Sequence, residues 1–240
     1  MLGQALDLLD TFGPAVRDNT IVVFHSDHGY QLGELNEWSK KTTTELATRV
    51  PLMVRAPWKT ASVGARTGVR AELVDLYRTL VDLAELDAST LQADIQGESL
   101  APLFDAPAAP PPSLSSKSGF SQIGSCACRV YGPKGANNWT GMECDAGRCV
   151  RTNVSDFDFM GYSMISPDGW RGTLWAPMNN VTERVDFSKP TYFELYNQSG
   201  DTGADFDYDA YFYNVAQDAV NADRVAAMRT SIINAVESWY

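Results

Sequence analysis

An aspartate and a histidine are adjacent in the stretch Ser26-Asp27-His28-Gly29, which directly follows a short apolar run. A carboxylate beside an imidazole can ligate a divalent cation through oxygen and nitrogen, and a glycine lets the backbone approach a ligand closely. The same pair is more often a hydrogen-bonded turn than a metal site. Asp27 and His28 are therefore candidate metal ligands, with a structural turn as the alternative.

A second histidine, His25, lies on the same strand face as Asp27 because side chains alternate with a period of two. It is a candidate for lining the site and contacting a substrate. The alternative is a partly buried histidine that is hydrogen-bonded to backbone.

The elements that would position these residues follow an α/β pattern. Residues 20–25 and 50–55 are apolar runs rich in β-branched side chains, which are typical of strands buried on both faces. Ligands bind at the carboxyl ends of strands in open α/β sheets, where Asp27 and His28 fall. Helical spacing is present over residues 1–17 and 71–86, and in the second segment one apolar face is shared by Leu73, Leu76, Leu80 and Leu83. Residues 1–104 are therefore predicted to form an α/β domain.

The remainder of the chain has a different character. Residues 105–118 hold four prolines in six positions, which indicates a linker. Residues 119–240 are predicted to form a smaller α+β subdomain, with strands of an antiparallel sheet at 159–165, 172–176 and 191–196 and a helix over 216–239. Aromatic residues of such a sheet are more often core than sugar-stacking platforms; those in question are Tyr162, Trp170 and Trp175.

Cysteines and glycosylation sequons are concentrated in one stretch. The four cysteines are Cys126, Cys128, Cys144 and Cys149. They predict two disulfides of open pairing, with a four-thiolate zinc site as the alternative. The four N-x-Ser/Thr sequons begin at Asn138, Asn153, Asn180 and Asn197. Together they predict a glycoprotein of the secretory pathway, either lysosomal or extracellular.

Charge and hydropathy exclude two classes of partner. The chain has 19 basic and 30 acidic residues and a net charge of −11, which argues against a nucleic-acid-binding protein because such proteins need a basic face. No apolar stretch approaches the roughly 18 residues of a membrane-spanning helix. The first residues also lack the basic and apolar regions of a signal peptide, so we expect the chain to begin inside a domain.

Longer motifs in the sequence resemble the type I sulfatases of the alkaline-phosphatase-like superfamily, most closely their iduronate-sulfatase branch. The motifs between residues 19 and 57 are Ser26-Asp27-His28-Gly29, Leu32-Gly33-Glu34, Glu37-Trp38, Lys40 and Val50-Pro51-Leu52. Weaker matches extend the resemblance over most of the chain: Glu72–Leu80, Gln96–Leu103, Phe120-Ser121-Gln122, Met160–Ser163 and Glu194-Leu195-Tyr196.

The resemblance implies a fold and a chemistry. The fold is the C-terminal half of a sulfatase α/β sandwich, followed by a small α+β subdomain with an antiparallel sheet. Asp27 and His28 match calcium ligands, and Lys40 matches the lysine that contacts the substrate sulfate. The activity is hydrolysis of a sulfate ester on a sulfated glycan, with Ca²⁺ and a formylglycine nucleophile. A hard cation and an ammonium suit this chemistry because charge moves to the leaving oxygen.

The sequence departs from the family in three ways. It holds no Cys/Ser-x-Pro-x-Arg motif, from which formylglycine is made, and no first pair of metal-binding aspartates upstream of Asp27. Leu35-Asn36 stands where the family often has His-Gly. We therefore expect a partial chain that has no turnover alone, because the nucleophile and half of the calcium site would lie in a missing N-terminal half that acts as its partner.

Two other functions remain open. A glycosylated sulfatase-like module could bind glycans or a partner without catalysis, although Asp27, His28 and Lys40 are all retained. A related phosphodiesterase or phosphonate hydrolase would use further histidines on its metals, and this chain has only two.

Overall fold

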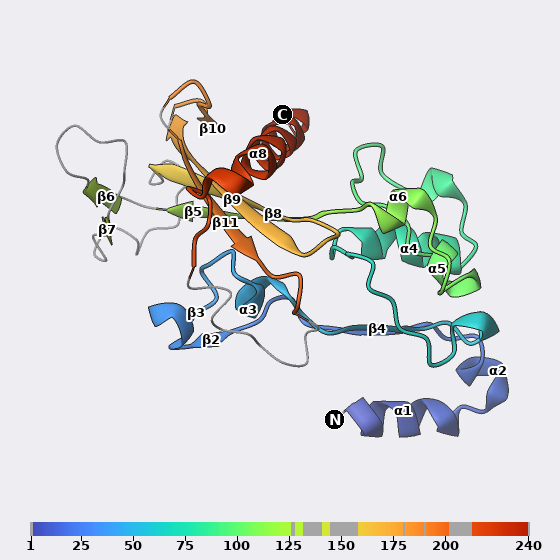
Figure 1. Ribbon diagram of the computed structural model, residues 1–240. Coiled ribbons are helices and arrows are strands. Elements are labelled where there is room, and N and C mark those ends of the chain that lie inside the picture. The colour runs from blue at the N-terminus through green and yellow to red at the C-terminus, as the bar shows by residue number, and fades with distance from the viewer. Residues whose placement is uncertain are drawn as a thin grey trace. The chain divides into compact units, whose positions relative to one another are not determined.

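The computed structural model describes residues 2–125, 128–131, 141–144, 158–179, 181–189, 191–201 and 213–239. The chain divides into two compact units (Figure 1). The N-terminal unit is Met1–Gly29 with Arg49–Gly119, and the C-terminal unit is Tyr30–Thr48 with Phe120–Tyr240. Residues 30–48, which fall inside the first domain predicted from the sequence, thus group with the C-terminal unit. The domain limits predicted at 104 and 118 stay predictions.

The N-terminal unit begins with two short helices, α1 (Leu2–Thr11) and α2 (Pro14–Arg17). The helical pattern over residues 1–17 is interrupted because Gly13 takes a φ of 78°, in the left-handed region that favours glycine. Pro14 then starts α2, where its fixed φ suits the first helical position.

A two-stranded antiparallel sheet follows. It pairs β1 (Val22–His25) with β4 (Leu52–Arg55), so that Val22 is opposite Arg55 and His25 is opposite Leu52. The expectation that these strands are buried on both faces is wrong for the described residues, because Phe24 is 38% and Met53 55% exposed. The apolar runs do form strands, but no third strand is described in this sheet. Leu52 of β4 packs against the buried residues Leu100, Leu103 and Leu114.

Helix α4 (Asp75–Leu83) supplies buried positions of the N-terminal unit. Of the predicted apolar face, Leu76 and Leu83 are buried and Leu80 is half-buried, whereas Leu73 lies before the helix and is 39% exposed. Val81, outside that face, is also buried. The unit also contains the 3-10 turns η2 (Thr60–Ser62) and η3 (Ala88–Thr90).

The proline-rich segment 105–118, which was predicted to be a linker, lies within the N-terminal unit and is partly helical. It follows α5 (Pro102–Asp105) and contains the helical turn α6 (Pro112–Ser115), which Pro112 opens at the first position. Leu114 is 1% exposed and packs in a cluster with Leu100 and Leu103. The proline-rich segment therefore contributes a buried leucine to the N-terminal unit.

The C-terminal unit is built on a five-stranded sheet with β9 (Trp170–Asn179) at its centre. Antiparallel to β9 run β8 (Phe159–Ile165), β10 (Arg184–Val185) and β11 (Tyr192–Asn197), and β5 (Gly119–Ser125) lies beyond β8. The strands predicted at 159–165, 172–176 and 191–196 are confirmed.

One face of this sheet packs against α8 (Ala222–Ser238), which follows the turn η5 (Ala219–Asn221) (Figure 1). The helix contributes Met228, Ile232 and Val236, each at most 4% exposed. The sheet contributes Tyr162, Met164, Leu174, Phe193 and Leu195. Tyr162 is therefore a core residue, as its place in an antiparallel sheet favours.

Short elements complete the description. The segment 30–48 contains β2 (Gln31–Leu32), the turn η1 (Glu34–Asn36), β3 (Trp38–Ser39) and α3 (Glu45–Thr48). A separate hairpin pairs β6 (Cys128–Tyr131) with β7 (Gly141–Cys144). None of the described helices is both long enough and apolar enough to cross a bilayer.

Candidate functional site

The Asp27–His28 pair follows the end of β1, where the sequence pattern predicts a site. The Oδ2 atom of Asp27 lies 3.5 Å from Nε2 of His28, and the side chains are 81% and 32% exposed. The turn that carries them is hydrogen-bonded: the His28 amide donates to Asp27 Oδ1 at 3.1 Å, and the Ser26 hydroxyl donates to the His28 carbonyl at 2.7 Å. The structure therefore brings the two predicted ligands together on a fixed turn.

The other ring nitrogen of His28 determines what this pair can bind. Nδ1 lies 2.7 Å from the Gly29 carbonyl oxygen, which can only accept, so in the neutral ring Nδ1 carries the proton. The Nε2 lone pair then faces the Asp27 carboxylate. A backbone carbonyl that fixes the tautomer in this way is characteristic of metal-bound histidines. The donor set thus suits a cation shared by Nε2 and Oδ2; a protonated His28 would instead form an ion pair.

The described residues supply only these two ligands at this place. Within the described ranges, no group of three or more His, Cys, Asp or Glu side chains could hold a metal ion. Calcium takes six to eight oxygen ligands in typical sites, so the Asp27 carboxylate is a suitable ligand, whereas the nitrogen of His28 is not a typical one. The roles of Asp27 and His28 as calcium ligands stay predictions.

The other predicted site residues lie nearby in sequence. His25 is exposed at the end of β1, with Nδ1 3.2 Å from the Ser26 carbonyl oxygen. Lys40 is exposed in the turn after β3 and belongs to the C-terminal unit, whereas Asp27 and His28 belong to the N-terminal unit. The predicted roles of His25 and Lys40 in substrate binding stay predictions.

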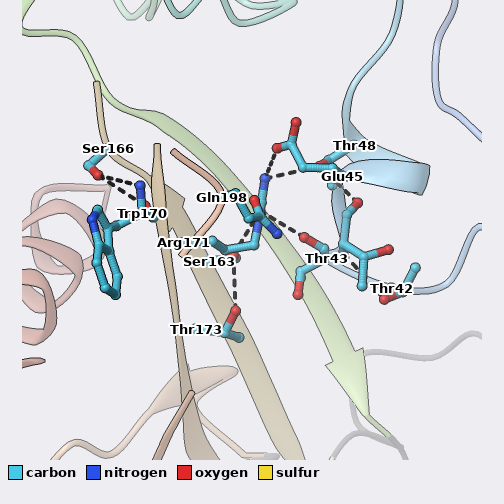
Figure 2. A network of polar contacts seen from close by, with 11 residues as sticks. Thr42, Thr43, Glu45, Thr48, Ser163, Ser166, Trp170, Arg171, Thr173 and Gln198 are labelled. Carbon is cyan, nitrogen blue, oxygen red and sulfur yellow. Dashed lines mark hydrogen bonds and ion pairs between the residues drawn. The ribbon is translucent and has the colours of Figure 1, made fainter. Parts of the chain in front are cut away.

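The sequence analysis missed a buried polar network that joins strand β9 to residues 42–48, which follow Lys40 in the sequence (Figure 2). Its centre is Arg171 on β9, whose guanidinium forms an ion pair with Glu45. Arg171 Nη1 also donates to the Thr43 carbonyl at 2.7 Å and to Ser163 Oγ at 3.0 Å. Arg171 and Glu45 are 3% and 4% exposed. The sequence offered one signal for this network: Arg171 and Thr173 are polar residues two positions apart in a predicted strand, so they lie on the same face of the sheet.

A second missed group is Glu194 on β11, in the stretch that resembles the sulfatases. Burial raises the pKa of Glu194 to about 7, although hydrogen bonds from Trp175 and Tyr196 act to lower it. Burial, and next the charge of Glu194, raise the pKa of the Tyr196 phenol well above its usual range. Glu194 is therefore a carboxyl group that can change charge near neutral pH.

The glycosylation and cysteine predictions are mostly beyond the described residues. Asn138, Asn153, Asn180, Cys126 and Cys149 lie outside them. Asn197 is exposed at the end of β11, and its Oδ1 accepts the Ser199 amide at 3.1 Å. In the β6–β7 hairpin, the backbone register places Cys128 opposite Cys144. Glycosylation and disulfide bonding stay predictions.

Comparison with known proteins assigns the first third of the chain. The sulfatase family model matches residues 1–86, which include Asp27, His28 and Lys40. Residues 1–86 are therefore similar to the sulfatase family. Iduronate 2-sulfatase of Mus musculus is 37% identical over 108 residues, covering 35% of this chain and 19% of that protein. The chain thus spans about a fifth of the length of the curated relatives it matches.

Solved structures with a similar fold extend the likeness to nearly the whole chain. One is a protein in complex with its substrate D-glucosamine-2-N,6-O-disulfate; the TM-score is 0.61 with 21% identity, covering 99% of this chain and 37% of that one. Another is a phosphonate monoester hydrolase of Agrobacterium radiobacter, with a TM-score of 0.66 and 17% identity, covering 97% of this chain and 38% of that one. These likenesses confirm the predicted sulfatase-type α/β fold.

Proposed function

We propose that the protein containing this chain is a sulfuric ester hydrolase that acts on sulfated glycans, of the type that iduronate 2-sulfatase represents. The observation that carries the proposal is the sulfatase match over residues 1–86 together with the convergence of Asp27 Oδ2 and His28 Nε2 at 3.5 Å. Two acceptors this close need a cation or a proton between them. The Gly29 carbonyl that accepts from Nδ1 is typical of a metal-bound histidine, which supports the cation.

In the proposed site, Asp27 and His28 supply two of the ligands of a calcium ion. When bound, this ion would polarise the sulfate oxygens as a Lewis acid. The Lys40 ammonium binds the sulfate and compensates negative charge as the bond to the leaving oxygen breaks. The sequence holds no Cys/Ser-x-Pro-x-Arg motif, so the residues present do not fit a formylglycine nucleophile. The 240-residue chain alone is therefore proposed to be inactive.

The proposed location is a lysosomal or extracellular compartment. Four sequons and four cysteines in the second half of the chain support it, as does the exposure of Asn197 at a turn. Enzymatic removal of N-glycans from protein secreted by cultured cells tests it, because a loss of mass that requires Asn197 is expected.

The test of activity uses the longest reading frame that contains this chain, produced in cells that make formylglycine, with 4-nitrocatechol sulfate and a 2-O-sulfated iduronate disaccharide as substrates. Lys40→Ala is expected to lower kcat/KM about 100-fold, because it removes a charge that stabilises the transition state. Asp27→Asn is expected to raise the calcium concentration for half-maximal activity about tenfold or more. Lys41→Ala, next to Lys40 in the sequence, is the matched control and should stay within about twofold of the parent.

Each result decides part of the proposal. Equal activity of the Lys40 and Lys41 variants would remove Lys40 from the site. Calcium-dependent turnover by the 240-residue chain alone would show that its site is complete.

The second candidate, a phosphate- or phosphonate-ester hydrolase, is favoured by the fold shared with a phosphonate monoester hydrolase. Bis(4-nitrophenyl) phosphate and a phenyl phosphonate ester are therefore assayed in parallel. A higher kcat/KM on either than on every sulfate ester would replace the sulfatase proposal. Binding of the disaccharide without any turnover would instead favour a non-catalytic module.

A further inference from the structure

The guanidinium of Arg171 is buried within the C-terminal unit. Side chains alternate along β9, and its neighbour Gly172 faces Phe193 and Met228 in the core, so Arg171 points to the opposite face of the sheet. Sheet residues hold the guanidinium there: Ser163 Oγ accepts at 3.0 Å and Gln198 Oε1 at 3.4 Å, while Thr173 Oγ1 donates to Ser163 Oγ at 3.0 Å. The sheet thus fixes the orientation of a charged fork.

The other contacts of this fork all go to one short segment, residues 42–48 (Figure 2). Arg171 forms the ion pair with Glu45, donates to the Thr43 carbonyl at 2.7 Å and lies 3.5 Å from Thr48 Oγ1. The only helix in the segment is α3, which has four residues. So short a helix is not stable by itself, so the segment needs this external support.

Lys40 lies three residues before Thr43, the backbone group that Arg171 holds. On its other side, Ser39 pairs with Gln31, which is fully buried. Three residues reach about 10 Å, so the bond to Thr43 limits where the Lys40 backbone can go. Without the bond to Thr43, the next strand that could hold the chain after Lys40 is β4, which begins twelve residues later at Leu52. Twelve residues span up to about 40 Å, so β4 restricts the position of Lys40 much less.

We propose that Arg171 is a positioning residue for Lys40: with Glu45 and the Thr43 carbonyl it clamps residues 42–48 to the sheet and so fixes the lysine that binds the substrate sulfate. The positioning of Lys40 for catalysis rests on the proposed function, whereas the clamp itself does not. Small displacements of a group that stabilises the transition state can cost about 100-fold in rate. Loss of the clamp is therefore expected to reduce activity while Lys40 itself is retained.

The test variant is the pair Arg171→Met with Glu45→Met. It removes both charges together, so neither remains buried and unpaired, which makes folding of the variant feasible. The control is Arg224→Met, which breaks the ion pair with Asp168 in the same unit, where the side chains are 36% and 55% exposed, and has no described contact with residues 42–48. Single Arg171→Lys keeps one charge but loses the fork, and an intermediate effect is expected.

The first measurement is hydrogen exchange, followed by mass spectrometry, on peptides that span residues 37–48 of the 240-residue chain. The amides of Ala47 and Thr48 bond to the Thr44 carbonyl, so their exchange reports whether the segment is held. Exchange in these peptides is expected to rise tenfold or more in the double variant and to stay at the parent rate in the Arg224→Met control, with peptides over residues 230–238 of α8 unchanged in both. Parent-like exchange at residues 37–48 in the double variant would overturn the clamp.

The second measurement is kcat/KM on 4-nitrocatechol sulfate with the longest reading frame. A fall of tenfold or more in the double variant, with the control unchanged, supports the positioning of Lys40. Faster exchange with unchanged kcat/KM, when Lys40→Ala does reduce it, would overturn the positioning role. If the parent protein hydrolyses no sulfate ester, the proposed function fails, while the exchange result still decides the clamp.

Discussion

Asp75→Ala is expected to lower the free energy of unfolding of the N-terminal unit by about 3–5 kcal/mol, because it removes one of the two carboxylates paired with the Lys117 ammonium and leaves two backbone amides without their acceptor. Asp75 has no exposed surface, and its carboxylate accepts the amides of Glu72 at 2.7 Å and Glu98 at 2.8 Å. It also lies 3.2 Å from the ammonium of Lys117, whose side chain is 12% exposed. Removal of the carboxylate leaves three donors with fewer acceptors.

The Lys117 ammonium makes this loss large. Burial acts to lower the pKa of Lys117. The carboxylates of Glu72 and Asp75 together raise it by more, so the pKa lies above its ordinary value. Hydrogen exchange of α4 amides through a denaturant series measures the loss within this unit. Asp82→Ala, on an exposed position of the same helix, is the control and should cost under about 1 kcal/mol. Equal losses in the two variants would contradict the role of Asp75; partial recovery in Asp75→Ala with Lys117→Met would support it.

The Asp75 contacts show what local sequence patterns cannot predict. The period of α4 places Leu76 and Leu83 inside the unit, but Asp75 and Thr79 are buried beside them. Their partners, Glu98 and the Leu100 amide, are more than twenty residues away in the chain. The pairing of Arg171 with Glu45 spans 126 residues. Polar residues that pair across such long stretches of sequence produce no periodic pattern. A hydrophobicity pattern therefore shows that a polar residue is present but does not predict its partner.

Elements that bury an apolar face within one unit were predictable. The apolar and aromatic runs of β8, β9 and β11 predict strands, and α8 repeats with helical spacing, because all four pack into one core. The apolar run of β1 predicted a strand correctly but not its exposure, since burial depends on layers that a strand cannot specify. In the proline-rich segment, prolines exclude a long helix, but Pro112 is compatible with the first position of the short helix α6.

The candidate site divides in the same way. Asp27 and His28 are adjacent, so the motif and the turn that holds them are local, and the sequence was sufficient to bring them together. Lys40 depends on a segment held by Arg171, and that dependence is visible only after folding. The motif therefore names the residue that is proposed to bind sulfate, while long-range contacts determine where the chain holds it.

Glu194 predicts a pH dependence of stability in the C-terminal unit. Its folded pKa of about 7 lies above the ordinary 4.5, so between these values the folded state binds more protons than the unfolded state. Stability then falls as pH rises: the contribution is fully present below about pH 4.5 and is lost by about pH 7. The difference corresponds to about 3 kcal/mol. An acidic compartment, such as the lysosome proposed above, would keep this contribution.

Glu194→Gln removes the titration but keeps an uncharged acceptor for Trp175, so the fall in stability between pH 4.5 and 7.5 is expected to shrink by about 3 kcal/mol. Hydrogen exchange of β11 and α8 amides at the two pH values, corrected for intrinsic exchange rates, measures the change within this unit. Glu237→Gln, an exposed position at the end of α8, controls for the loss of a surface charge. An unchanged pH dependence in Glu194→Gln would show that Glu194 titrates over the same pH range in the folded and unfolded states. Burial would then be too weak to raise its pKa, and β11 would carry a charged carboxylate at neutral pH.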